Sequence, residues 1–269
     1  MKLGYSAATA GLYDLDAVFR FAAELELDFV ELNFDTYDFL PAVQTAEEVI
    51  ELKRATGIEV TLHLPFVDIN IASLIPTARK AAVEQMQRGL DYGAAIDAGC
   101  AVMHTGHVFL YQPVPRERAF DALEASLTEL RSSPIPIALE NLAVFEDGLI
   151  REAAMLGRIS KAAGFGNCLD FGHAHIEAIR PWRQGANWGN DLIRDYINTL
   201  GSNILHLHLC NNNGQEDLHT ATDKGSIAFE KYSDYLANFK GTICLEVAGG
   251  PSEVRRSAKH IRSLISVVA

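Results

Sequence analysis

Short apolar stretches alternate with longer amphipathic stretches along the whole chain. Each apolar stretch is rich in Val, Ile, Leu or Phe, and in the segment after it apolar residues recur at helical spacing. This alternation predicts strands that are each followed by a helix. The predicted strands cover residues 2–6, 29–34, 59–65, 100–107, 134–141, 166–175 (a strand and turn), the first part of 204–219 (a strand and loop) and 242–250.

Local signals mark where the intervening helices begin and end. Asp14 can cap a first helix, and Thr45 with Glu48 forms a capping box for the next, which Gly57 closes. An irregular insert is expected at residues 176–190. The remaining predicted helices cover residues 77–98, 116–131, 149–163, 191–200 and 229–239, and a last one begins at Pro251.

Eight strand-then-helix units in a chain of 269 residues favour one architecture. Regular β–α alternation indicates a parallel sheet, and eight such units favour a closed (β/α)8 barrel, the TIM barrel, over an open sheet. No linker or low-complexity segment interrupts the pattern. We therefore expect an α/β fold in which residues 1–269 form a single TIM-barrel domain.

Composition and net charge limit the classes of function that we expect for this chain. The formal net charge of −12 counts mildly against nucleic acid as a partner, because an acidic surface repels phosphodiesters. The amino terminus lacks the apolar core of a signal peptide, and no apolar run approaches transmembrane length. The four cysteines lie far apart without CxxC spacing. These features predict a cytoplasmic protein with reduced, buried thiols and no membrane partner.

The most informative stretch runs from Ile204 to His219. Its strand alternates Leu with His, so His206 and His208 share one face, and Asp217 and His219 follow in the loop. Imidazole and carboxylate groups at this density suit a divalent cation such as zinc or manganese. A network of hydrogen bonds between the same groups is the alternative, since either arrangement satisfies buried polar atoms.

Further polar side chains fall at the carboxyl ends of six successive predicted strands. In a barrel these ends open on one face, where active sites of this fold lie. His107, His175 and His206 are interpreted as supporting or structural, and His260 as a surface residue. The candidate metal ligands are His63, His104, Glu140, Asp170, His173, His208, Asp217, His219 and Glu246.

An ordered set of short motifs carries a family resemblance. The motifs are HLP with a later Asn (His63 to Asn70), VMHTG, LEN, LDFGH, HLHLCNN, DLH and LEV. Together they resemble the xylose isomerase-like TIM barrels over nearly the whole chain. That superfamily joins endonuclease IV-type apurinic/apyrimidinic (AP) endonucleases with sugar and sugar-phosphate isomerases and epimerases.

The resemblance implies two alternative metal centres. In the endonuclease branch, matching residues hold three zinc ions. Here the first ion would be held by His63 and His104, with Glu140 bridging to the second, which Asp170, His208 and Glu246 would complete. The third ion would be held by His173, Asp217 and His219. In the isomerase branch, the positions of Glu140, Asp170, His208 and Glu246 hold one manganese or similar ion. There the two glutamates also move a proton through a metal-stabilised enediolate.

The surrounding loops favour the isomerase alternative. The loop after His63 has no positive charge and the loop after the second strand is acidic, whereas a DNA enzyme needs basic residues for phosphates. After the seventh strand, HTATDKGS stands where many relatives have a Leu-Gly-Glu-Gly-like segment. A few basic and aromatic residues depart from this pattern of loops without positive charge. They are candidate sugar- or phosphate-binding residues, with a DNA contact or a plain surface position as the alternatives. They are Arg180, Trp182, Arg183, Trp188 and Lys224.

The leading hypothesis is therefore a sugar or sugar-phosphate isomerase or epimerase with one to three divalent metal ions, zinc or manganese. Glu140 and Glu246 are the expected catalytic residues, and a small sugar or sugar phosphate is the expected partner. A three-zinc phosphodiesterase acting on abasic DNA is the main alternative. A barrel that binds a ligand or metal without turnover is the third.

Overall fold

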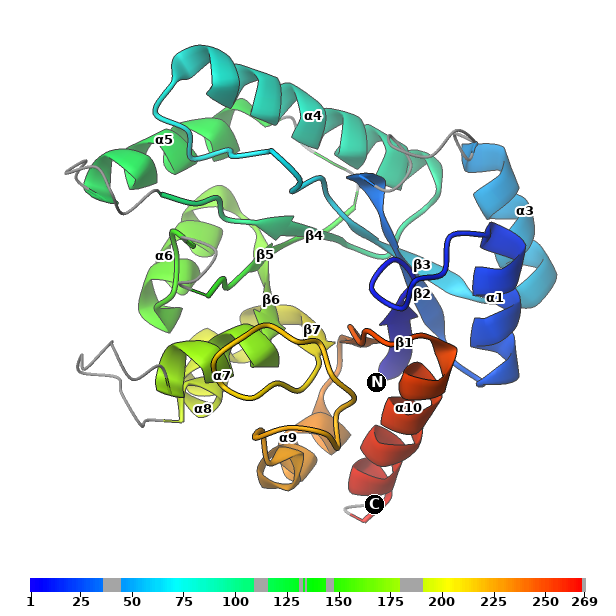
Figure 1. Cartoon of the computed structure of the whole chain (residues 1–269). Coiled ribbons are helices and arrows are strands. Elements are labelled where there is room, and N and C mark those ends of the chain that lie inside the picture. The colour runs from blue at the N-terminus through cyan, green and yellow to red at the C-terminus, as the bar shows by residue number, and fades with distance from the viewer. Residues whose placement is uncertain are drawn as a thin grey trace.

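Parallel strands close into a barrel at the centre of the molecule (Figure 1). The computed structural model describes residues 1–35, 45–108, 116–130, 133, 135–143, 148–179 and 191–267. The strand order β1-β2-β3-β4-β5-β6-β7-β8 returns to β1, which confirms the predicted (β/α)8 fold. The strands are β1 (Lys2–Ser6), β2 (Phe29–Asn33), β3 (Glu59–His63), β4 (Ala101–His104), β5 (Ile137–Glu140), β6 (Gly166–Asp170), β7 (Ile204–Leu209) and β8 (Thr242–Leu245).

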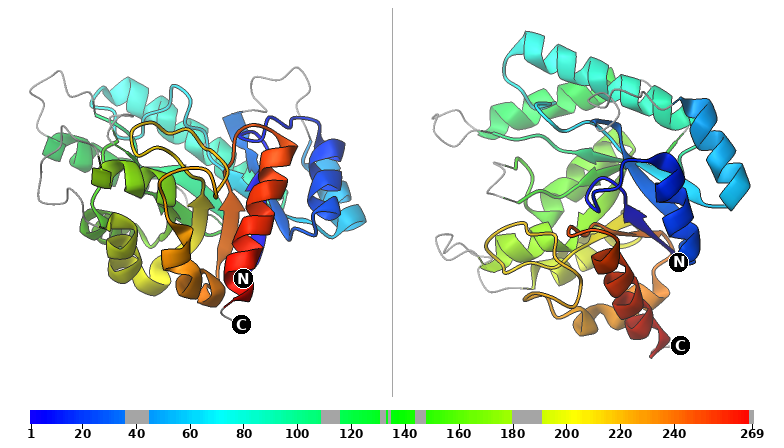
Figure 2. Two further views of the ribbon diagram at one scale, coloured as in Figure 1. Left: turned by 60° about the horizontal axis from the view of Figure 1, so that its bottom comes forward. Right: turned by 45° about the vertical axis from the view of Figure 1, so that its right-hand side comes forward.

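Helices surround this barrel on the outside (Figure 2). Residue 1 and the end of the last described helix lie at the same end of the barrel, the end where the strands begin. The helices are α1 (Leu15–Glu24), α3 (Ala46–Thr56), α4 (Pro76–Ala95), α5 (Arg116–Glu129), α6 (Ala153–Ala163), α7 (Phe171–Ile179), α8 (Leu192–Leu200), α9 (Ser233–Asn238) and α10 (Pro251–Ser266).

The expected capping signals operate as predicted. The Asp14 side chain accepts a hydrogen bond from the Ala17 amide at the start of α1. Thr45 and Glu48 form the reciprocal capping box of α3. Gly57 ends that helix at φ 75°, a left-handed conformation that costs glycine little.

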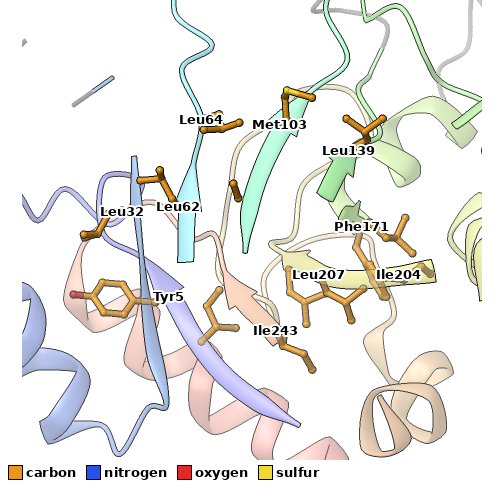
Figure 3. Close-up of a cluster of buried hydrophobic side chains, with 14 of the residues drawn as sticks. Tyr5, Leu32, Leu62, Leu64, Met103, Leu139, Phe171, Ile204, Leu207 and Ile243 are labelled. Atoms are coloured by element: carbon orange, nitrogen blue, oxygen red, sulfur yellow. The ribbon is translucent and has the colours of Figure 1, made fainter. Parts of the chain in front are cut away.

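Alternation along the strands separates an apolar exterior from a polar interior. Outward-facing side chains pack between the barrel and its helices, where Tyr5, Leu32 and Leu207 are fully buried (Figure 3). Burying a side chain of that size contributes about 1.5–3 kcal/mol. The inward-facing side chains are mostly polar, with a small apolar cluster of Val102, Ala138 and Cys168. Glu31 pairs in register with Thr61, and two residues further along the strands Asn33 pairs with His63.

Three predicted helix boundaries are wrong, and strands β4, β5 and β8 are shorter than predicted. Helix α7 begins directly after β6, so residues 176–179, expected in the irregular insert, are helical, while residues 180–190 lie outside the described part. Helix α6 begins at Ala153 rather than near residue 149. The segment after β7 forms a 3-10 turn, Phe229–Tyr232, before α9, instead of one continuous helix.

Two further expectations concern the chain as a whole. Within the described ranges, no helix combines the length and apolar character that crossing a membrane requires. All four cysteines are free and buried, as expected. The extent of the domain, residues 1–269, stays a prediction.

Candidate metal centre

Four strand ends bring three carboxylates and one imidazole together. Glu140 and Asp170 are the last residues of β5 and β6, His208 lies near the end of β7, and Glu246 directly follows β8. Each offers one ligand atom within 4.8 Å of the others. Nδ1 of His208 lies 3.1 Å from both Glu140 Oε1 and Glu246 Oε2, and 4.0 Å from Asp170 Oδ2. This constellation is the first ligand group.

A second ligand group shares Glu140. Nε2 of His63 lies 3.5 Å from Glu140 Oε2, and Nε2 of His104 lies 3.3 Å from the same oxygen. Because Oε1 of Glu140 faces His208, this carboxylate connects the two groups. The arrangement agrees with the bridging position that the sequence resemblance implies.

The third ligand group lies in the loop after β7 and at the start of α7. Asp217 Oδ2 is 2.7 Å from His219 Nε2 and 3.3 Å from His173 Nε2. The buried thiol of Cys210 also belongs here, since its sulfur lies within 4.8 Å of ligand atoms of Asp217 and His219. Cys210 was not among the predicted ligands, although its position two residues after His208 places it on the same side of the chain.

Backbone carbonyls fix the orientation of several histidine rings. Nδ1 of His63 bonds to the carbonyl of Leu64 at 2.8 Å, and Nδ1 of His219 bonds to the carbonyl of Glu246 at 3.0 Å. Nδ1 of His173 bonds to the Asn141 carbonyl at 2.9 Å. When Nδ1 carries the proton and donates it, Nε2 keeps a free lone pair directed at the neighbouring carboxylates, as metal ligation requires.

The ionisable side chains of the three ligand groups shift one another's pKa. Burial raises the pKa of Asp170 to about 7, and the carboxylates of Glu140 and Glu246 add to the rise. Burial also opposes ionisation of Glu246, but the charges of His208 and His219 outweigh it and lower the pKa to about 2. Protons on the histidines thus offset the charge of the carboxylates when no cation does.

The chemistry of the donor set fits a divalent metal ion. Glu140 Oε2, Asp170 Oδ2 and Asp217 Oδ1 are buried oxygens that accept no hydrogen bond from the described residues. Unsatisfied buried carboxylate oxygens are costly, and a metal ion satisfies them. The first group has mainly oxygen ligands, which suit manganese or magnesium as well as zinc, whereas imidazole and thiol in the third group favour zinc.

The other predicted site residues lie elsewhere or outside the described part. Arg180, Trp182, Arg183 and Trp188 are among residues 180–190, which are not described. Lys224 Nζ lies 2.7 Å from Glu253 Oε2 of α10, so its ammonium has a carboxylate partner.

The histidines interpreted as supporting have identifiable contacts. His175 Nε2 bonds to Ser226 Oγ at 2.7 Å, and His206 lies inside the barrel beneath His208. His260, expected at the surface, is instead half-buried, and its Nδ1 bonds to Thr222 Oγ1 at 2.9 Å. That expectation is therefore wrong.

One aromatic side chain missed in the sequence lies at the rim of the site. The Phe66 ring centroid is 5.0 Å from the ring centroids of both His63 and His104, and the residue is 39% exposed. Its position three residues after a strand-ending histidine was the available signal. Phe66 gives the opening of the site an apolar wall.

Comparison with known proteins agrees with this architecture. The family model described as xylose isomerase-like TIM barrel matches residues 19–264. The chain belongs to this family. An uncharacterised protein of Methanocaldococcus jannaschii is 26% identical to this xylose isomerase-like barrel over 255 residues, covering 92% of each chain.

Solved structures share the fold of this xylose isomerase-like barrel at low identity. A D-tagatose 3-epimerase-like protein has a TM-score of 0.82 at 23% identity, covering 100% of this chain and 98% of that one. Endonuclease IV from Thermus thermophilus has a TM-score of 0.73 at 17% identity, covering 99% of this chain and 100% of that one. The neighbours thus include enzymes of both chemistries that the sequence suggested.

Proposed function

We propose that this protein is a divalent-metal-dependent isomerase or epimerase of sugars or sugar phosphates. The observation that carries the proposal is the position of Glu140 and Glu246. Their carboxylates approach one atom, Nδ1 of His208, at 3.1 Å each, and they come from β5 and from the end of β8. With two carboxylates that converge from separate strands, one can remove a proton from the substrate and the other can return it.

Glu140, Asp170, His208 and Glu246 would hold the metal ion. Such an ion, when bound, polarises a carbonyl or hydroxyl oxygen and makes the neighbouring C–H more acidic. Glu246 is held in place by the hydroxyl of Thr9, which donates to Oε1 at 3.4 Å. With its pKa lowered to about 2 by the charges of His208 and His219, Glu246 is ionised at neutral pH and has the negative charge that a cation ligand needs.

The rim of the site supports a small polar substrate with an apolar face. Glu140, Asp170 and His208 are buried, whereas the side chains of His104 and His219 are 19% and 22% exposed, so access runs past these two rings. Phe66 lies beside His104. An aromatic ring next to polar ligands can pack against the CH groups of a sugar.

Surface charge supports a sugar over DNA. The chain has a net charge of −12, and the loop after His63 presents the exposed apolar side chains of Phe66, Val67, Leu74 and Ile75. Duplex DNA requires basic contacts to its phosphates. These residues provide none.

A second candidate rests on the two additional ligand groups. His63 and His104 on one side, with His173, Asp217 and His219 on the other, supply more ligands than a single ion needs. Several metal ions side by side suit phosphodiester hydrolysis, since they can activate water and stabilise both oxygens of the displacement. A phosphodiesterase acting on abasic DNA is therefore the alternative.

Deuterium exchange distinguishes the two candidates directly. Protein loaded in turn with Mn²⁺ and Zn²⁺ is incubated in D₂O with a panel of ketoses, aldoses and their phosphates, and in parallel with abasic DNA. The proposal expects product formation with deuterium at the carbon beside the carbonyl. Glu246→Gln should lower this rate about 10²–10⁴-fold, while the matched change of an exposed acid, Glu216→Gln, should leave it unchanged.

Cleavage of abasic DNA without sugar exchange, abolished by Glu246→Gln, would replace the isomerase with the phosphodiesterase. Full binding of metal without turnover of any of these substrates would favour a non-catalytic barrel.

A further inference from the structure

Beneath the ligand groups, the barrel interior contains one more carboxylate. Glu31 lies in the middle of β2 and has no exposed surface. Its Oε1 is 3.1 Å from Nε2 of His208, and its Oε2 is 3.1 Å from Nε2 of His206. Glu31 therefore lies behind the His208 ring, whose other nitrogen faces Glu140 and Glu246.

Neighbouring strands hold Glu31 in this position. The hydroxyl of Thr61 on β3 donates to Oε2 at 3.2 Å, and the thiol of Cys244 on β8 donates to Oε1 at 3.7 Å. His206 is fixed in turn, because its Nδ1 bonds to Thr242 Oγ1 at 2.6 Å. The carboxylate is thus fixed from three strands before any ligand binds.

Burying a carboxylate this deep in the barrel costs free energy of folding. The contacts of Glu31 among the described residues are two histidines, a threonine and a cysteine, and include no lysine or arginine. The positive charge of a protonated His208 is shared with Glu140 and Glu246, so it does not fully compensate Glu31. An apolar side chain of similar volume would stabilise this layer better. The position therefore calls for a role other than packing.

We propose that Glu31 is a positioning residue for the metal centre. By accepting a hydrogen bond from Nε2–H of His208, it selects the tautomer whose Nδ1 lone pair is directed at Glu140, Asp170 and Glu246. At 3.1 Å the oxygen is within hydrogen-bond distance but off the N–H axis, so a small ring rotation completes the bond. The inference rests on the proposed function, since it requires His208 to ligate the metal.

A carboxylate behind a metal-bound imidazole makes the ring a stronger and better-oriented ligand, and losing it typically weakens metal binding 10–100-fold. The test measures Zn²⁺ affinity by competition with a chromophoric chelator, and the visible spectrum of Co²⁺-loaded protein. The variants are Glu31→Gln, Glu31→Asp and, as a control at a buried polar residue of α6 that bonds to Gly157 and Asn203 away from the ligand groups, Ser160→Ala. His208→Gln is combined with Glu31→Gln to form a double-mutant cycle.

The expected result is an affinity about 10- to 100-fold lower in Glu31→Gln, with a changed Co²⁺ spectrum. Ser160→Ala should leave the affinity within about threefold of the original and the spectrum unchanged. Glu31→Asp, which keeps the charge, should lose less affinity than the Gln variant. In the His208→Gln background the Glu31→Gln change should have no further effect, because the residue acts through that ring.

Three outcomes overturn the inference. Equal affinity and spectrum in the original protein and in Glu31→Gln would refute the positioning role alone. If Glu31→Gln does not fold, an unchanged Co²⁺ spectrum in Glu31→Asp refutes it equally. If the original protein binds none of these ions, the proposed function itself fails.

Discussion

Asn141 bonds to both backbone groups of Asp170. Its side-chain oxygen accepts from the Asp170 amide at 2.8 Å, and its side-chain amide donates to the Asp170 carbonyl at 3.0 Å. Since Asn141 directly follows Glu140, this contact fixes the separation of two proposed ligands on neighbouring strands. All three residues are at most 1% exposed, so water cannot replace the bonds easily.

Replacing Asn141 with Ala should therefore lower the free energy of unfolding by about 1–3 kcal/mol, because it leaves buried backbone groups unpaired. Urea denaturation of the metal-free protein measures this. Asn238→Ala, on the exposed end of α9, is the control and should change stability by less than about 0.5 kcal/mol. Equal effects of the two substitutions would contradict the structural role of Asn141.

The third ligand group should be separable from the first. His219→Ala removes the imidazole that lies 2.7 Å from Asp217 and should lower the zinc content by one ion per chain, measured by elemental analysis after dialysis. His175→Ala, whose ring bonds to Ser226 outside the ligand groups, should leave the zinc content unchanged. A metal content that does not respond to His219→Ala would restrict binding to the first two groups.

Metal-free protein should become less stable as the pH rises above about 7. Burial would lower the pKa of both His208 and His219, but Cys168 and Glu246 raise it well above the usual value for His208, and Glu246 and Cys210 do so for His219. A raised folded-state pKa contributes stability that is complete below the unfolded pKa, about 6.5, and is lost as the pH rises through the folded value.

Bound Zn²⁺ replaces those protons, so the stabilisation that it provides should grow with pH. Thermal melting at pH 7, 8 and 9, with and without one equivalent of Zn²⁺ per site, tests both the loss of stability of the metal-free protein with pH and the growing stabilisation by Zn²⁺. A melting temperature of the metal-free protein that stays constant over this range would contradict the assigned protonation of the histidines.

The narrow lower part of the barrel should not accept an added methyl group at Gly4. A Cβ atom there would lie 2.4 Å from the Phe29 carbonyl oxygen and 2.6 Å from its ring. Gly4→Ala should thus lower the free energy of unfolding by about 1–3 kcal/mol through overpacking, as measured in urea. Gly99→Ala, whose Cβ would be 3.7 Å from its nearest neighbour, is the matched control and should cost less.

Much of the fold follows from the sequence because its signals are local. Strand and helix periods differ, and caps such as Thr45 with Glu48 need only neighbouring residues. The convergence of His63, Glu140 and Glu246 was predictable as well, since parallel strands in a closed barrel all end on one face.

Other features depend on contacts that no short stretch contains. The alternation in β2 fits Glu31 facing either way, and only the closed barrel places it against His208. The early start of α7 depends on Asp170, whose side chain accepts a hydrogen bond from the His173 amide at 2.5 Å and thereby caps the helix. Cys210 gains its neighbours from a loop that folds back.

The direct passage from β6 into α7 has a consequence for how this protein could diversify. Asp170 ends the strand, caps the helix and contributes to the first ligand group, with no connecting residue between strand and helix. An insertion or deletion at the junction of β6 and α7 would disturb the strand end, the helix cap and the metal ligand together. Longer connections elsewhere on the same face tolerate changes in length. Changes in substrate preference should therefore accumulate in those longer connections, while the length of the chain at this junction stays fixed.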